Sequence, residues 1–134
     1  MKKVDNLFIV DDDEAYRFLA KEIIGETDLV NQIKVFYNGK EAIDFLKTAH
    51  YNPDNLPEVI LLDLNMPIMD GWEFLSEYTA LKPRIGKKIT IYIVSSSIDP
   101  RDIERAKSIS DVTDFIIKPI SKEHFVEVVK NLQG

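Results

Sequence analysis

The sequence predicts an α/β domain in which five strands and five helices alternate along 134 residues. Two observations support this prediction. Short apolar runs without polar alternation recur along the chain and are typical of strands buried on both faces of a sheet. Between them lie stretches with apolar residues at i, i+3 and i+4, the spacing of amphipathic helices. The alternation predicts a mostly parallel sheet with helices on both faces and right-handed crossovers.

The composition is that of one globular domain, with 45% hydrophobic and 30% charged residues. The absence of cysteine excludes a disulfide framework, a thiolate nucleophile and a cysteine-based zinc site, and it fits a reducing compartment. A net charge of -6 argues against direct nucleic-acid binding. Every apolar run is too short for a signal peptide or a membrane span. We therefore expect a cytoplasmic protein that binds neither nucleic acid nor membrane.

The first predicted strand, residues 7–10, ends at three successive aspartates. The amphipathic helix after it repeats apolar residues at i, i+4 and ends near Gly25. The second predicted strand is 33–37. The helix after it has Asn38 as a good N-cap and Glu41 three residues later, the pattern of a capping box.

A long loop broken by two prolines, residues 50–58, precedes the third predicted strand, 59–62. This loop is either a surface for a partner or an elaboration of the fold, and we favour the elaboration. The strand ends at Asp63, where the chain turns. Asp70 and Glu73 form a second capping-box pattern and mark the start of the third helix.

The basic loop 82–88 is interpreted as a solvated turn before the fourth predicted strand, 89–97. Asp99, followed by a proline, has the N-cap signature of the fourth helix. The fifth predicted strand is 115–117, and Ser121 is expected to cap the last helix.

The carboxyl ends of parallel strands meet at one edge of the sheet, which is where open α/β sheets bind ligands. The second strand brings only Tyr37 and Asn38 to that edge. Charged or nucleophilic side chains follow the other four strands: Asp11, Asp12, Asp63, Ser95 and Lys118. This is the strongest functional signal that the residues themselves give.

Three carboxylates in one crevice repel each other, and a hard divalent cation such as magnesium relieves the repulsion. Lys118 adds a positive charge and Ser95 a hydroxyl, so the set can hold a phosphoryl group. Asp63 is the expected nucleophile, forming an acyl phosphate. Neither His50 nor His124 stands at a strand end, which gives no support to a histidine base or metal site.

Four motifs in this order and spacing resemble the receiver domain of two-component response regulators, of the stand-alone chemotaxis type. They are VDDD at 10–13, LLDLNMPIMDG at 61–71, VSSS at 94–97 and IIKPI at 116–120. The resemblance covers nearly the whole chain. It implies a flavodoxin-like sheet with strand order 2-1-3-4-5 and a single receiver domain over 1–134 without an output domain.

The resemblance also assigns roles to the polar residues at the carboxyl edge of the sheet. It makes Asp63 the phosphoacceptor, modified in the presence of magnesium. Asp12 would be the direct metal ligand of the acidic pair, and Asp11 would act mainly through metal-bound water. Asn65 would supply its backbone carbonyl to the metal. Lys118 would pair first with Asp63 and later with the phosphoryl oxygens.

The resemblance also implies how phosphorylation changes the conformation of the protein and the binding of its partners. Ser95 would be the hydroxyl that moves towards the phosphoryl group, and Lys118-Pro119 would be a cis peptide bond. Phe115 replaces a tyrosine that is common in the family, so an output through a tyrosine hydroxyl is not expected. Phe115 should turn from exposed to buried. The implied partners are a sensor histidine kinase or histidine phosphotransfer protein, and a target protein that docks on the fourth helix, fifth strand and fifth helix.

Three other functions compete with a switch that is not itself an enzyme. A magnesium-dependent phosphatase or phosphotransferase would need a second acid two residues after the nucleophile, where this chain has Asn65. A degenerate receiver that only binds partners would not need the five charged or nucleophilic residues at the carboxyl edge of the sheet. A phosphorelay intermediate, passing the phosphoryl group to a histidine phosphotransfer protein, needs the same site and stays open.

Overall fold

The computed structural model describes residues 2–49 and 52–133 of the chain. The described residues form one five-stranded parallel sheet with the order β2-β1-β3-β4-β5, which confirms the predicted fold class and strand order. The strands are β1 (Val4–Val10), β2 (Val30–Phe36), β3 (Val59–Leu62), β4 (Thr90–Ser95) and β5 (Val112–Ile117).

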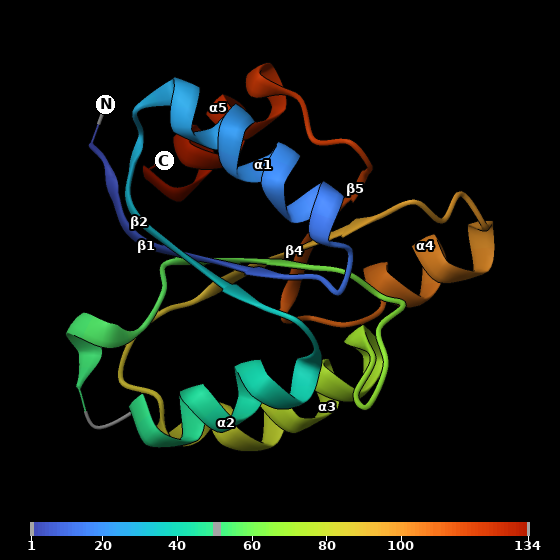
Figure 1. The fold of residues 1–134 in the computed structure, drawn as a ribbon. Helices are drawn as coiled ribbons and strands as arrows, with labels where there is room; N and C mark the ends of the chain where they lie inside the picture. Colours follow the sequence, from blue (N-terminus) through green and yellow to red (C-terminus); the bar gives the residue numbers. More distant parts are fainter. Residues whose placement is uncertain (1, 50–51, 134) are drawn as a thin grey trace.

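Helices cover both faces of this sheet (Figure 1). Helices α1 and α5 pack on one face, and their buried side chains share a core with the residues of the sheet that point to that side. Helices α2, α3 and α4 pack on the other face around a second core. The helices are α1 (Glu14–Thr27), α2 (Gly39–Ala49), α3 (Gly71–Leu81), α4 (Pro100–Lys107) and α5 (Lys122–Gln133).

β3 matches its predicted bounds and β1 its predicted end, but the predicted starts of β1 and β2 were three residues too late. Val4 pairs with Val30 across the two strands, and the Val4 N–H donates to the Leu29 carbonyl at 2.7 Å. Polar residues at the start of both strands hid this pairing, because most of them face solvent at the amino-terminal end of the sheet.

The strand β5 also starts three residues before its predicted position, and β4 is shorter than predicted at both ends. β5 lies at an edge of the sheet, and half of its residues are exposed to solvent. The polar Thr113 and Asp114 in this exposed part concealed the strand in the sequence. Residues 96–97 leave the sheet after Ser95 and turn towards α4.

Two loops at the amino-terminal edge of the sheet are more ordered than predicted. The loop before β3 contains a short 3₁₀ helix (Pro53–Asn55) and buries Leu56 completely. The basic loop 82–88 is only partly a solvated turn. Its Lys82 pairs with Asp111 at 2.6 Å, and the Lys87 ammonium donates to the Leu56 carbonyl at 3.0 Å.

The helix starts follow the predicted capping chemistry. Asp70 and Glu73 form the complete capping box of α3. Asn38 caps α2 by accepting from the Glu41 N–H at 2.9 Å, but Glu41 accepts from the Tyr37 N–H and not from that of Asn38. Within the described residues, none of the helices has both the length and the apolar character that crossing a membrane requires.

Candidate functional site

The backbone ladder of the central strands fixes the position of two buried aspartates. The Asp11 N–H donates to the Phe36 carbonyl at 3.0 Å, and the Asp63 N–H donates to the Val10 carbonyl at 2.9 Å. Each aspartate is therefore held by the last rung of a parallel ladder, one residue beyond its strand. Their side chains leave the sheet at its carboxyl edge, as the sequence predicted.

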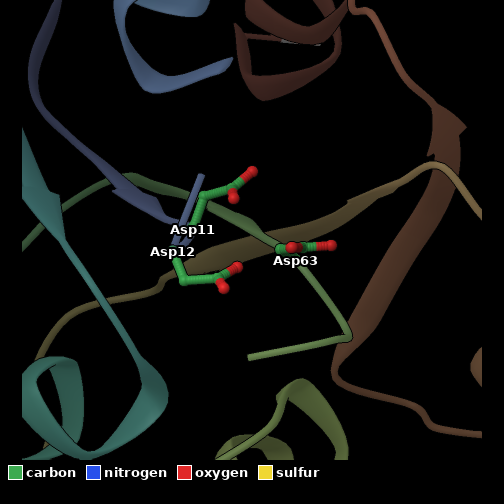
Figure 2. A group of neighbouring side chains, drawn as sticks. All are labelled: Asp11, Asp12 and Asp63. Atoms are coloured by element: carbon green, nitrogen blue, oxygen red, sulfur yellow. The ribbon is translucent and has the colours of Figure 1, made fainter. Parts of the chain in front are cut away.

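Asp11, Asp12 and Asp63 form a cluster in which one carboxylate oxygen from each lies within 4.8 Å of the others. Figure 2 shows Asp11 and Asp12 at the end of β1 and Asp63 at the end of the neighbouring β3. Asp11 and Asp63 are buried, whereas Asp12 is exposed. Three hard oxygen donors at this spacing, open to solvent on one side, fit a divalent cation such as magnesium.

Lys118, directly after β5, supplies the positive charge of the site. Its ammonium lies 2.8 Å from Asp11 Oδ2 and 3.5 Å from Asp63 Oδ2. The closer partner is thus Asp11, and not Asp63 as the resemblance implied. The Tyr16 ring lies 4.2 Å from the ammonium and attracts it through a cation–π contact. Because Tyr16 belongs to α1, which follows β1, this contact draws Lys118 towards Asp11.

The environment of Asp63 disfavours its ionised form. Burial, and then the charge of Asp11, raise the pKa of Asp63 to about 6. Lys118 and the Leu64 N–H, which donates to Asp63 Oδ1 at 2.8 Å, act in the opposite direction. The carboxylate is therefore destabilised near neutral pH without a metal, and a bound cation would relieve this.

Ser95 is the last residue of β4 and is completely buried. Its carbonyl accepts from the Lys118 N–H at 2.9 Å, which ties the Ser95 backbone to the end of β5. Its hydroxyl accepts from the Ser97 N–H at 3.2 Å. The backbone of Ser95 is fixed, and rotation about its side chain is what remains free to redirect the hydroxyl.

The remaining predicted residues lie around this group. Asn65 is exposed in the loop after β3, and Tyr37 is exposed after β2. The prediction for Phe115 was wrong in part, because Phe115 lies inside β5 and is already half-buried against the core. His124 is exposed on α5, away from the strand ends, and His50 lies outside the described residues.

Two contacts of the site were not anticipated. The Arg17 guanidinium of α1 donates to the Asp11 carbonyl at 2.7 Å and lies 4.3 Å from the centre of the Tyr37 ring. Gly71, at the start of α3, packs so closely that a Cβ there would lie 2.5 Å from the Asp63 carbonyl oxygen. The Asp-Gly pair in the sequence signalled a turn, but not this approach to Asp63.

The geometry and the comparison with known proteins agree. Residues 7–130 match the family model of the response regulator receiver domain. The chain belongs to this family. The receiver domain also has the Lys118-Pro119 peptide bond in the cis form that the resemblance implied.

Several known proteins resemble this receiver domain over most of its length. A two-component response regulator from Cytophaga hutchinsonii has a crystal structure with a TM-score of 0.89 and 29% identity, covering 98% of both chains. The probable methanogenesis regulatory protein FilR2 of Methanothrix harundinacea is 28% identical over 95% of this chain and 80% of its own. The sensor histidine kinase CheAY of Helicobacter pylori is 38% identical over 69% of this chain, which is 11% of its own length.

Membership of the family defines the general function. Receiver domains of two-component systems act as phosphoacceptor switches and interact with histidine kinases or phosphotransfer proteins. The acidic cluster at the carboxyl edge of this sheet is consistent with that role.

Proposed function

We propose that Asp63 accepts a phosphoryl group and that the resulting acyl phosphate switches the conformation of this receiver domain. The observation that carries the proposal is the cluster at the edge of the sheet. Asp63 is buried between the end of β1 and Lys118, with its carboxylate within 4.8 Å of Asp11 and Asp12 and 3.5 Å from the Lys118 ammonium. Asp63 therefore lies beside two other carboxylates and beside a cation that can balance the negative charge of the incoming phosphoryl oxygens.

The transfer itself needs one nucleophile. An Asp63 carboxylate oxygen attacks the phosphorus atom, and the bond from phosphorus to the donor breaks, leaving its electron pair on the donor. Lys118 moves from the two aspartates to the phosphoryl oxygens, and the Ser95 hydroxyl donates to one of them.

The metal site is part of this proposal. Asp11, Asp12, Asp63 and the Asn65 carbonyl would hold magnesium, with Asp12 as the direct ligand of the acidic pair. When bound, magnesium would neutralise the carboxylates and the charge of the phosphoryl oxygens. Asp12 suits direct ligation because it is exposed, whereas the carboxylate of Asp11 is engaged by Lys118 and by the Asp13 N–H at 2.9 Å.

The output is proposed to pass through Ser95 to the face formed by α4, β5 and α5, where a target protein docks. Phe115 would complete its burial when the Ser95 hydroxyl moves. The phosphoryl group would come from a sensor histidine kinase or a histidine phosphotransfer protein. The cytoplasmic location stays a prediction.

Intact-mass measurement tests the phosphoacceptor. The protein is incubated with magnesium and acetyl phosphate, and we expect the mass of one phosphoryl group to be added. Asp63→Asn should abolish the addition, because its amide is not a nucleophile at neutral pH. Asp44→Asn is the matched control, since Asp44 is an exposed carboxylate that pairs with Lys40 on the surface of α2.

Treatment with neutral hydroxylamine supplies a second criterion, because hydroxylamine attacks the acyl carbon of an acyl phosphate and releases phosphate, whereas a phosphoserine ester has no such carbon and stays intact. Labelling of Asp63→Asn at the rate of the wild-type protein would overturn the assignment. Labelling that is equally fast in the presence of a magnesium chelator would overturn the role of the metal.

A further inference from the structure

The loop between β4 and α4 connects the buried hydroxyl of Ser95 to the first turn of α4 through side chains that the family resemblance does not assign. Ser97, half-buried in this loop, uses both its backbone and its side chain in the connection. Its N–H donates to the Ser95 hydroxyl at 3.2 Å. Its own hydroxyl donates to Asp102 Oδ2 of α4 at 2.7 Å and accepts from the Asp99 N–H at 3.3 Å.

The bond between Ser97 and Asp102 is the short, charge-assisted member of this chain of contacts. It holds a helix that lies along β5 but buries few side chains in the core. Ala106 is the only buried residue among the eight described residues of α4. On the side towards α3, the Arg105 guanidinium lies 4.3 Å from the centre of the Trp72 ring. The position of α4 therefore depends strongly on a few polar contacts.

We infer that Ser95, Ser97 and Asp102 form a latch that holds α4 in the unphosphorylated position and is released when the Ser95 hydroxyl turns to the phosphoryl group. This inference deepens the proposed function and rests on it. In this role Ser97 and Asp102 are positioning residues, because they act on the site through Ser95.

Release follows from hydrogen-bond geometry. The Ser95 hydroxyl has one rotatable bond, whereas the Ser95 backbone is tied to the Lys118 N–H. Turning the hydroxyl towards Asp63 moves the acceptor away from the Ser97 N–H. The Ser97 backbone must then find another partner, which shifts its hydroxyl relative to Asp102 and frees the first turn of α4.

Thermodynamic linkage makes the latch measurable. If the latch is closed without a phosphoryl group and open with one, its contacts oppose binding of any phosphoryl mimic. Removing them must therefore increase the affinity for the mimic. A net contribution typical of one hydrogen bond predicts an increase of about two- to tenfold.

The experiment titrates beryllofluoride, as a phosphoryl mimic, into the full chain at a fixed magnesium concentration and follows the bound species by fluorine NMR. Ser97→Ala and Asp102→Ala should each lower the half-saturating concentration by about two- to tenfold. Ser97→Thr retains a hydroxyl and should keep the wild-type value. The double variant should lower the half-saturating concentration by no more than the larger of the two single effects, because both substitutions break the same hydrogen bond.

The chain offers matched controls for both positions. Ser96→Ala removes a serine hydroxyl from an exposed position in the same loop, and Glu104→Ala removes an exposed carboxylate from the same helix. Both should bind beryllofluoride like the wild-type protein. Urea denaturation of each variant shows that the proteins compared are folded. Fluorescence of Trp72, the single tryptophan of the chain, reports on the contact with α4 in parallel.

The outcomes separate the latch from the proposed function. If the wild-type protein does not bind beryllofluoride, the proposed function fails and the latch fails with it. If the wild-type protein binds and Ser97→Ala has an unchanged or higher half-saturating concentration, the latch alone is overturned. It is also overturned if Ser97→Thr behaves like Ser97→Ala, or if the two control variants gain the same affinity.

Discussion

Helices α3 and α4 follow neighbouring strands and both begin at an aspartate N-cap, yet they are anchored to the sheet in different ways. The helix α3 buries five of its eleven residues and starts with Gly71 in close contact with the backbone of Asp63. The helix α4 buries one of eight and depends on the contacts of Asp102 and Arg105.

The difference separates the site into a fixed part and a movable part. Apolar packing resists displacement, because moving a helix would open cavities in a close-packed core. Polar contacts at a surface can be exchanged for contacts with water or with a ligand at a smaller net change in free energy. The side of the site with Asp63 and α3 is therefore suited to hold the phosphoryl group, and the side with Ser95 and α4 is suited to respond to it.

The largest expected effect tests this comparison through stability. Phe74 of α3 is completely buried, so Phe74→Ala should lower the free energy of unfolding by about 3–5 kcal/mol. Ile103 of α4 is half-buried, and it removes less apolar area from water on folding. Ile103→Ala should therefore lower the free energy of unfolding by about 1 kcal/mol. Urea denaturation measures both values. Equal losses would contradict the difference in anchoring.

The second prediction concerns the negative charge of Asp63, which lies in the fixed part of the site. Because the pKa of Asp63 is raised to about 6 in the folded protein, folding favours its protonated form. The contribution of Asp63 to the stability of the wild-type protein therefore falls as the pH rises from about 4 to above 6. Asp63→Asn has no such charge, so without metal it should be more stable than the wild type by up to about 3 kcal/mol at pH 7 to 8.

The same comparison below about pH 4 is its control, because Asp63 is then protonated in both the folded and the unfolded state. The two proteins should have similar stability there. Thermal denaturation in the presence of a chelator, across this range of pH, measures the difference. A gap that stays constant with pH would show that the Asp63 charge is not its cause.

The third prediction separates the two parts of the site. Ser95→Ala should still be phosphorylated at Asp63, but its α4 should respond weakly. A charge-assisted hydrogen bond contributes roughly 1.5–3 kcal/mol, enough to change a two-state population about 10- to 100-fold. NMR spectra with and without beryllofluoride measure the response. A wild-type shift of Phe115 and α4 in Ser95→Ala would exclude the coupling.

The smallest expected effect distinguishes the two neighbouring aspartates. Asp12→Ala should weaken magnesium binding more than Asp11→Ala, since Asp12 is exposed whereas Asp11 is paired with Lys118. Titration calorimetry with magnesium compares the two affinities. Equal affinities, or a larger loss in Asp11→Ala, would reverse the proposed ranking.

The sequence predicted the buried centre of the fold better than its edges. Apolar runs located β3 and the end of β1, because a strand buried on both faces excludes polar residues. The start of β5 was missed because Thr113 and Asp114 face solvent at the edge of the sheet.

The candidate site followed the same rule. Its membership could be predicted, since parallel strands bring their carboxyl ends to one edge. The pairings could not be predicted, because they depend on side-chain placement across elements. Lys118 lies closer to Asp11 than to Asp63, and Ser97 reaches Asp102 only because the loop after β4 folds back on α4.

Hydrogen–deuterium exchange of the wild-type protein, with magnesium and with or without beryllofluoride, tests the division into a fixed and a movable part most directly. We expect exchange to change in residues 95–107, which contain the latch and α4, and to stay nearly constant in residues 71–81 of α3. Changes of equal size in both helices, or a change confined to α3, would contradict the account.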